Sequence, residues 1–135
     1  MNYLYMVDEV LNRIEAEALE NSGKLDLSDC SLIRIPLEIC QLTNLKSLNL
    51  SRNSIVDITP ISNLLNIESL DLSLNKITDI DSIQNLTQLT SLNLSYNKIR
   101  YLSPLKALPR LQILNVNKNQ INSIIVLANL KKLQV

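Results

Sequence analysis

Few side chains in this sequence of 135 residues could perform chemistry, and its aspartates are the main candidates. Asp57 and Asp79 lie 22 residues apart, a spacing that recurs along the chain. If each such unit contributes one strand to a parallel sheet, the two carboxylates would stack about 4.8 Å apart. Such a pair could share a proton or bind a cation. Aspartates that accept hydrogen bonds from the backbone of their own turns are far more common, and we favour that interpretation.

Composition excludes the other familiar kinds of active site. The chain has no histidine, so a Ser–His or Cys–His nucleophile cannot form within it. Its single glycine cannot build a phosphate-binding loop or a dinucleotide fingerprint. Two cysteines, Cys30 and Cys40, are too few for a disulfide framework or a zinc site, and nothing in the sequence suggests that either thiol is activated. We therefore expect a non-enzymatic protein with no catalytic residue, no cofactor and no metal.

The chain contains an internal repeat, which is clearest when the sequence is aligned with itself at an offset of 22 residues. One column of this alignment holds Leu45, Ile67, Leu89, Leu111 and Leu133, and a polar column holds Asn53, Asn75, Asn97 and Asn119. Further apolar columns begin at Leu48, Leu50, Ile55, Ile58, Ile61 and Leu64. An earlier copy with one inserted residue places Leu25 and Leu27 in strand columns and Cys30 in the asparagine column. Residues 22–135 therefore contain five copies, and Leu133-Gln134-Val135 begins a sixth.

Each copy predicts a strand, a turn and a short return segment. Leu48-Asn49-Leu50 alternates apolar and polar residues, as a strand with one buried face does. The asparagines that follow the strands can bond backbone groups that no neighbouring strand satisfies, so we expect an asparagine ladder. Cys30 would be a weaker first rung, because a thiol is a poor donor. Only 22 residues are available per copy, so the return segment should be 3₁₀ or irregular, with Pro60 and Pro104 starting short helical turns.

The pattern L-x-x-L-x-L-x-x-N-x-I resembles that of leucine-rich-repeat proteins. Residues 55–64 resemble the 22-residue class found in internalins and in the leucine-rich regulatory subunit of type-1 protein phosphatase. The first copy, with Ile35-Pro36-Leu37, is similar to repeats of bacterial Roco-type proteins, in which a helix comparable to Arg13-Ile14-Glu15 often precedes the first repeat. The resemblance covers about residues 22–135 and implies an α/β fold, a curved, right-handed leucine-rich-repeat solenoid of parallel β coils.

Residues 1–21 are expected to form a capping helix over the first coil. Leu4, Val7, Leu11, Ile14 and Ala18 recur at spacings of three and four, which predicts that they form the apolar face. Glu17 is expected on the polar face, and Gly23 is expected to cap the end of the helix. A membrane-surface or partner-binding helix is the alternative, and the acidic polar face argues against a membrane.

The end of the chain gains apolar residues at polar positions. Ile113 and Val135 stand in the column of Ser47, Ser69 and Ser91, while Ile125 and Val126 replace residues that are polar or proline elsewhere. This predicts an exposed apolar patch and an unpaired sheet edge. We expect either that the natural sequence continues, which we favour, or that another chain covers this end, including by self-association.

A partner is expected on the concave sheet, where side chains point out between the buried leucines. Three of its columns repeat small polar residues, namely those of Ser47, Asn49 and Ser51. A fourth column varies, holding Asp29, Arg52, Leu74, Tyr96 and Lys118. Because interface hot spots favour Tyr and Arg, the expected contacts are Arg52, Leu74, Tyr96 and Lys118, with Asp71 and Asn93 beside them. The alternative is that these are ordinary exposed residues.

Taken together, these features predict a protein–protein interaction module, a scaffold or regulatory subunit. The alternative is the N-terminal recognition segment of a larger signalling enzyme, such as a Roco-type GTPase. The net charge is zero and we expect neither end of the chain to be strongly basic, so binding to nucleic acid or to membranes is not predicted. With no apolar run suited to a secretory signal or a membrane span, the expected location is the cytoplasm.

Overall fold

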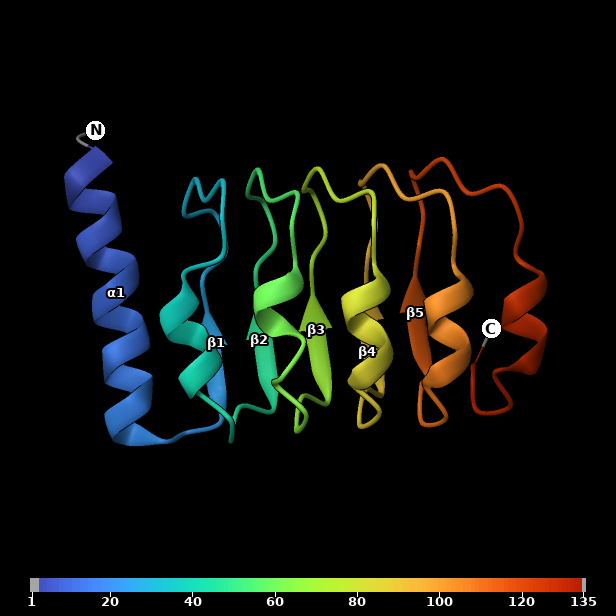
Figure 1. The fold of residues 1–135 in the computed structure, drawn as a ribbon, viewed down its shortest axis with the longest axis horizontal. Coiled ribbons are helices and arrows are strands. Elements are labelled where there is room, and N and C mark those ends of the chain that lie inside the picture. Colours follow the sequence, from blue (N-terminus) through green and yellow to red (C-terminus); the bar gives the residue numbers. More distant parts are fainter. Residues whose placement is uncertain (1–2, 135) are drawn as a thin grey trace.

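A computed structural model describes residues 3–134, which form a helix followed by a row of similar coils (Figure 1). Helix α1 covers Tyr3–Glu20. The five strands are β1 (Lys24–Asp26), β2 (Ser47–Asn49), β3 (Ser69–Asp71), β4 (Ser91–Asn93) and β5 (Ile113–Asn115). They make one parallel sheet in sequence order. Along this solenoid, position in the sequence is therefore also position in space.

The register of the sheet follows the sequence repeat. Ser47 pairs with Ser69 and Ser69 with Ser91, at the 22-residue offset, whereas Lys24 pairs with Ser47 at an offset of 23. The inserted residue therefore lies in the first coil, as expected. Gln134 donates its backbone N–H to the carbonyl of Gln112 at 2.9 Å, so a sixth coil begins to add to the sheet. Val135 lies outside the described residues.

The return segments are short 3₁₀ helices on the convex side, as the limited length of each copy predicts. They are η1 (Leu37–Gln41), η2 (Thr59–Ile61), η3 (Asp81–Asn85), η4 (Ser103–Ala107) and η5 (Ile125–Asn129). Pro60 and Pro104 lie in the first turns of η2 and η4, where a missing N–H costs nothing. None of the helices described is long and apolar enough to span a membrane.

The leucine and isoleucine columns form one continuous core. Leu48, Leu70 and Leu92 are each 1% exposed, and Leu50, Leu72 and Leu94 are fully buried. The core opens toward the last coil, where Leu114, Val116 and Leu127 are only partly buried. Ile113 and Ile125 are exposed there, as expected, whereas Val126 packs partly against the core.

The predicted asparagine ladder is present. Asn75 donates to the carbonyls of Leu50 and Leu72 at 2.9 and 3.1 Å, and its Oδ1 accepts the N–H of Ile55 at 2.9 Å. Asn53, Asn97 and Asn119 repeat these bonds in their own coils. Cys30 occupies the first rung and donates from Sγ to the carbonyl of Ser28 at 3.3 Å. The backbone N–H of Cys30 donates to Oδ1 of Asn53 at 3.1 Å.

Helix α1 caps the first coil, but its inward face differs from the predicted one. Val10, Ile14 and Glu17 are buried, whereas Val7 is 40% exposed and Ala18 is exposed. Leu4 has no described side-chain environment. The buried Glu17 accepts the N–H of Gly23 at 2.8 Å and the hydroxyl of Ser22, so a carboxylate fixes the connection into β1. Periodicity alone did not predict this, because a hydrogen-bonded glutamate took the place of an apolar residue.

The helix is also capped by a different residue from the one expected. Asn21, with φ of 49°, follows the last helical residue and donates its N–H to the carbonyl of Glu17 at 2.8 Å. Asparagine tolerates this left-handed conformation better than most side chains do. Gly23, with φ of 78°, instead turns the chain into β1, where its carbonyl accepts N–H groups from Lys46 and Ser47.

Candidate functional site

The variable column predicted as the contact site forms a row of exposed side chains just beyond the strands. Leu74 is 41% and Tyr96 is 52% exposed, and Arg52 and Lys118 are also exposed. The N–H of Arg52 donates to the carbonyl of Ser73, that of Leu74 to Ser95, and that of Tyr96 to Asn117, at 2.9 to 3.0 Å. The backbones of Arg52, Leu74 and Tyr96 are therefore held in place by the next coil, while their side chains stay exposed.

All members of this column have a left-handed backbone. The φ angles are 53° for Asp29, 58° for Arg52 and 56° for Leu74, Tyr96 and Lys118. Glycine and asparagine suit this conformation, whereas leucine and tyrosine adopt it at a cost. Four different large side chains therefore stand where the backbone would favour a small one. The sequence comparison of columns identified these residues, but only the structure shows this strain.

Asp71 and Asn93 lie directly opposite one another on β3 and β4, next to this row. Nδ2 of Asn93 donates to Oδ2 of Asp71 at 3.2 Å. The Oδ1 atom of each accepts both the N–H and the hydroxyl of the serine two residues later. Both side chains are half-buried and already bonded, so they support the surface more than they offer free groups.

The serine column that was expected to face the partner is largely turned inward. Ser51, Ser73 and Ser95 are 8%, 7% and 5% exposed. The expectation extended the strand alternation beyond Leu50, but the strands end earlier, at Asn49 and its equivalents. After that point the chain bends, and each serine N–H bonds the Asp or Asn side chain two residues before it.

A second variable column, just before the strands, was not predicted from the sequence. It holds Lys46, Glu68, Thr90 and Gln112, which immediately precede the strands. Lys46 Nζ lies 3.5 Å from Glu68 Oε1 across adjacent coils, with both side chains more than half exposed. Comparing every non-leucine column for variation, and not only those after the strand, would have revealed it.

The zero net charge conceals a separation of charge along the solenoid. Residues 1–81 contain 13 Asp and Glu but 6 Lys and Arg, whereas residues 82–135 contain 7 Lys and Arg and no Asp or Glu. Because coils follow one another in sequence order, the N-terminal half of the solenoid is acidic and the C-terminal half is basic. The expectation that neither end is strongly basic was wrong, because it rested on the total charge.

Asp57 and Asp79, the aspartates considered for catalysis, accept hydrogen bonds within their own turns. Oδ1 of Asp57 accepts the N–H and the hydroxyl of Thr59 at 2.8 and 2.6 Å, and Oδ1 of Asp79 accepts the N–H of Asp81 at 2.7 Å. The hydrogen bonds from Thr59 lower the pKa of Asp57. Among residues 3–134, no cluster of His, Cys, Asp and Glu has the arrangement of a metal site.

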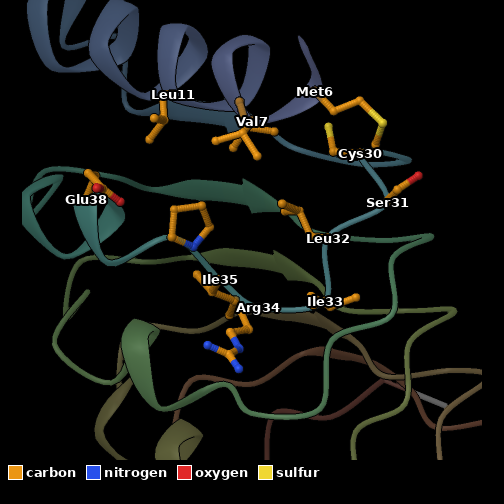
Figure 2. Close-up of a pocket in the computed structure, with 12 residues that line it drawn as sticks. Met6, Val7, Leu11, Cys30, Ser31, Leu32, Ile33, Arg34, Ile35 and Glu38 are labelled. Carbon is orange, nitrogen blue, oxygen red and sulfur yellow. The ribbon is translucent and has the colours of Figure 1, made fainter. Parts of the chain in front are cut away.

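A groove of about 540 Å³ separates part of α1 from the first coil (Figure 2). Val7 and Leu11 line it from the helix, and Leu32, Ile33 and Pro36 from the coil. Val7 is 40% exposed on this side of α1, whereas Val10 and Ile14 are buried. Cys30 lies at one end, where burial raises the pKa of its thiol above the usual value. A thiol with a raised pKa is a poor nucleophile at neutral pH.

Cys40 is half-buried and donates from Sγ to the carbonyl of Pro60 at 3.1 Å. Both cysteines are free thiols.

Two family models match the repeats described above. One for leucine-rich repeats in two copies matches residues 65–107, and one for a single leucine-rich repeat matches residues 44–64. Residues 44–107 therefore consist of leucine-rich repeats, and the parallel coils give the chain the architecture of a leucine-rich-repeat solenoid. No curated protein matches the sequence.

Solved structures with this architecture include two proteins of Listeria monocytogenes. Internalin C2 (strain 4b F2365) is 32% identical, with a TM-score of 0.81 over 90% of this chain and 54% of its own. The functional domain of InlJ, described as including a cysteine ladder, is 31% identical, with a TM-score of 0.76 over 87% of this chain and 25% of its own. The chain thus spans about half the length of the first of these structures and a quarter of the second.

Proposed function

We propose that this protein is a non-catalytic interaction module that holds a protein partner on the concave side of its sheet. Stacked repeats create an extended surface on which many residues can contact one partner, and leucine-rich-repeat proteins use it in this way. The contact residues are Arg52, Leu74, Tyr96 and Lys118, with Asp71 and Asn93 supporting them.

One observation carries this assignment. The column from Arg52 to Lys118 keeps large, varied and exposed side chains on left-handed backbones, with φ between 56° and 58°. The core does not contain these side chains, which are exposed, and the backbone conformation would favour asparagine or glycine. Strain that is retained at exposed residues supports a functional role.

The test is affinity capture from the native organism with the purified protein as bait, followed by mass spectrometry. Tyr96→Ala and Arg52→Ala should remain folded and lose the specific partner. Tyr101→Ala is the matched control, because Tyr101 is 67% exposed but lies outside the column. Equal capture by the wild type and by both column variants would remove this site.

A second candidate is a recognition segment within a larger signalling enzyme of the Roco type. The partly buried Leu114 and Leu127 favour it, since a further coil would cover them. The first copy, with its 23-residue offset, is the part that resembles Roco repeats, and the later copies resemble the 22-residue class. Genomic sequence beyond the codon for Val135 tests it, because further repeats followed by a GTPase phosphate loop would favour this candidate.

A cytoplasmic location belongs to the same proposal. The two free thiols, Cys30 and Cys40, suit a reducing compartment. Fractionation of the native cells with an antibody to the protein tests the location.

A further inference from the structure

One edge of the solenoid carries cations from four successive coils. We call this the ascending edge and define it as residues 50–56, 72–78, 94–100 and 116–122, which follow strands β2 to β5. Figure 1 shows these loops next to one another along the upper border of the solenoid. The edge contains Arg52, Lys76, Lys98, Arg100 and Lys118, all exposed, and no Asp or Glu.

None of these cations forms an ion pair within the part of the chain that the structure describes. The ion pairs among the described residues are Arg13 with Glu9 and Lys46 with Glu68, and neither involves the ascending edge. Arg100 Nε donates only to a neutral acceptor, Gln120 Oε1, at 3.3 Å. Asp57 and Asp79 begin the next stretch of the chain, and each is already bonded to its own turn.

The row on the left-handed backbones runs along the same edge. Across β2 to β5 it reads Arg52, Leu74, Tyr96 and Lys118, so two apolar side chains lie between two cations. Three inter-strand spacings separate the ends of this row, about 14 Å. An extended segment that crosses the coils covers that distance with roughly four or five residues.

We infer that the partner contributes an acidic segment with an apolar centre, which lies along the ascending edge across the coils. Its carboxylates pair with Arg52 at one end and with Lys98, Arg100 and Lys118 toward the other, while its apolar residues contact Leu74 and Tyr96. This inference rests on the proposed function and names the chemistry of the partner that the same surface would hold.

A short acidic protein segment fits this edge better than a nucleic acid does. Asp71 lies on the sheet side of the row, and Asp57 and Asp79 follow it on the convex side. A continuous polyanion would bring phosphates close to these carboxylates, whereas a peptide can place its charges only where the cations are. Base stacking would also have only Tyr96 available within the row.

The test measures fluorescence anisotropy of a short labelled peptide in which glutamates flank a central Leu-Tyr pair. The full-length protein should bind it, and bind neither the same peptide with lysine flanks nor a uridine-rich single-stranded RNA of similar length. The double variant Lys98→Glu with Arg100→Glu should weaken peptide binding at least about tenfold. The matched control, Lys106→Glu with Lys132→Glu, makes the same change of net charge in the basic half but away from the edge, and should change binding less than about twofold.

Equal weakening by both double variants would overturn the inference, because net charge alone would then explain binding. Tighter binding of the RNA than of the acidic peptide, or no peptide binding by the wild type, would also overturn it. Capture of the native partner separates this from the proposed function. If capture depends on Tyr96 but not on Lys98 and Arg100, the interaction module stands and the acidic segment is wrong. If capture depends on none of them, the acidic segment and the proposed contact site are both wrong.

Discussion

The side-chain Nδ2 of Asn75 lies 2.9 Å from the carbonyl oxygen of Leu50, a residue in the preceding coil. The same amide reaches the carbonyl of Leu72 in its own coil, and its Oδ1 accepts the N–H of Ile55. One buried side chain thus joins two coils at the point where both leave the sheet. The repeat depends on asparagine here because no other residue of this size combines two donors with an acceptor.

Replacing Asn75 with leucine should destabilise the protein by more than about 1 kcal/mol, because buried backbone groups lose their partner. The matched control is Asn119→Leu at the last rung. Asn119 makes the same kinds of bond but is half-exposed, so water can replace it and the loss should be smaller. Urea unfolding followed by circular dichroism measures both. Equal stability of Asn75→Leu and the wild type would contradict the role of the ladder.

The sequence was sufficient for the architecture because each column of the repeat has one physical role. Leu48, Leu70 and Leu92 had to be buried together, and the asparagine column had to replace missing backbone partners. The leucine-rich-repeat fold and the local hydrogen bonds of Asp57 and Asp79 were predicted from the same columns. The fold of a repeated unit can thus be predicted from sequence, since every copy has the same pattern of buried and hydrogen-bonded positions.

Features that depend on where the regular pattern stops were not predictable in the same way. Ser51 is buried because the strand ends at Asn49, and strand ends are poorly marked in sequence. Glu17 replaces an apolar residue on the inner face of α1 because it bonds Gly23. The charge separation was present in the sequence, but it acquires physical meaning only because the coils stack in order.

The left-handed column predicts a conflict between stability and function. Tyr96→Asn should stabilise the protein by up to about 1 kcal/mol, because asparagine adopts a positive φ more readily. The same variant should bind the native partner less well. Tyr101→Asn is the control, since Tyr101 is exposed without a positive φ and should show no gain. Thermal unfolding measures the difference between the two variants, and a loss of stability specific to Tyr96→Asn would count against strain at this position.

Asp57 should make the protein sensitive to acid. The hydroxyl and N–H of Thr59 lower the pKa of its carboxyl in the folded state, so the ionised form is favoured by folding. The resulting stabilisation is fully present above the unfolded pKa of about 3.9 and is lost as the pH falls through the lower folded value. Asp57→Asn keeps an acceptor for Thr59 and removes the titration, so its stability should fall less than that of the wild type between about pH 5 and about pH 2.

Carboxyl NMR of the wild type and of Thr59→Ala provides the direct measurement for Asp57. Loss of the hydroxyl should raise the pKa of Asp57 toward its usual value, while the remaining N–H bond keeps it somewhat low. An unchanged pKa in Thr59→Ala would show that the hydroxyl is not the cause.

The open last coil predicts weak self-association with a second copy of the chain. Ile113 and Ile125 are 58% and 80% exposed near β5, the last strand among the described residues, at positions where earlier coils carry Ser91 and Ser103. Exposed isoleucines next to the end of a sheet favour contact between copies. Sedimentation velocity over a range of concentrations should therefore show an average mass that rises with concentration.

Restoring the polar residues should prevent this association. The double variant Ile113→Ser with Ile125→Ser should remain monomeric at concentrations where the wild type associates, because the apolar contact at the end of the core is lost. Leu65→Thr is the matched control: Leu65 is 53% exposed but lies in an earlier coil, and threonine occupies its column at Thr43 and Thr87. Association that persists in the double variant, or that Leu65→Thr abolishes equally, would place the contact elsewhere on the molecule. A monomeric wild type at every concentration would show that the open coil alone does not drive self-association.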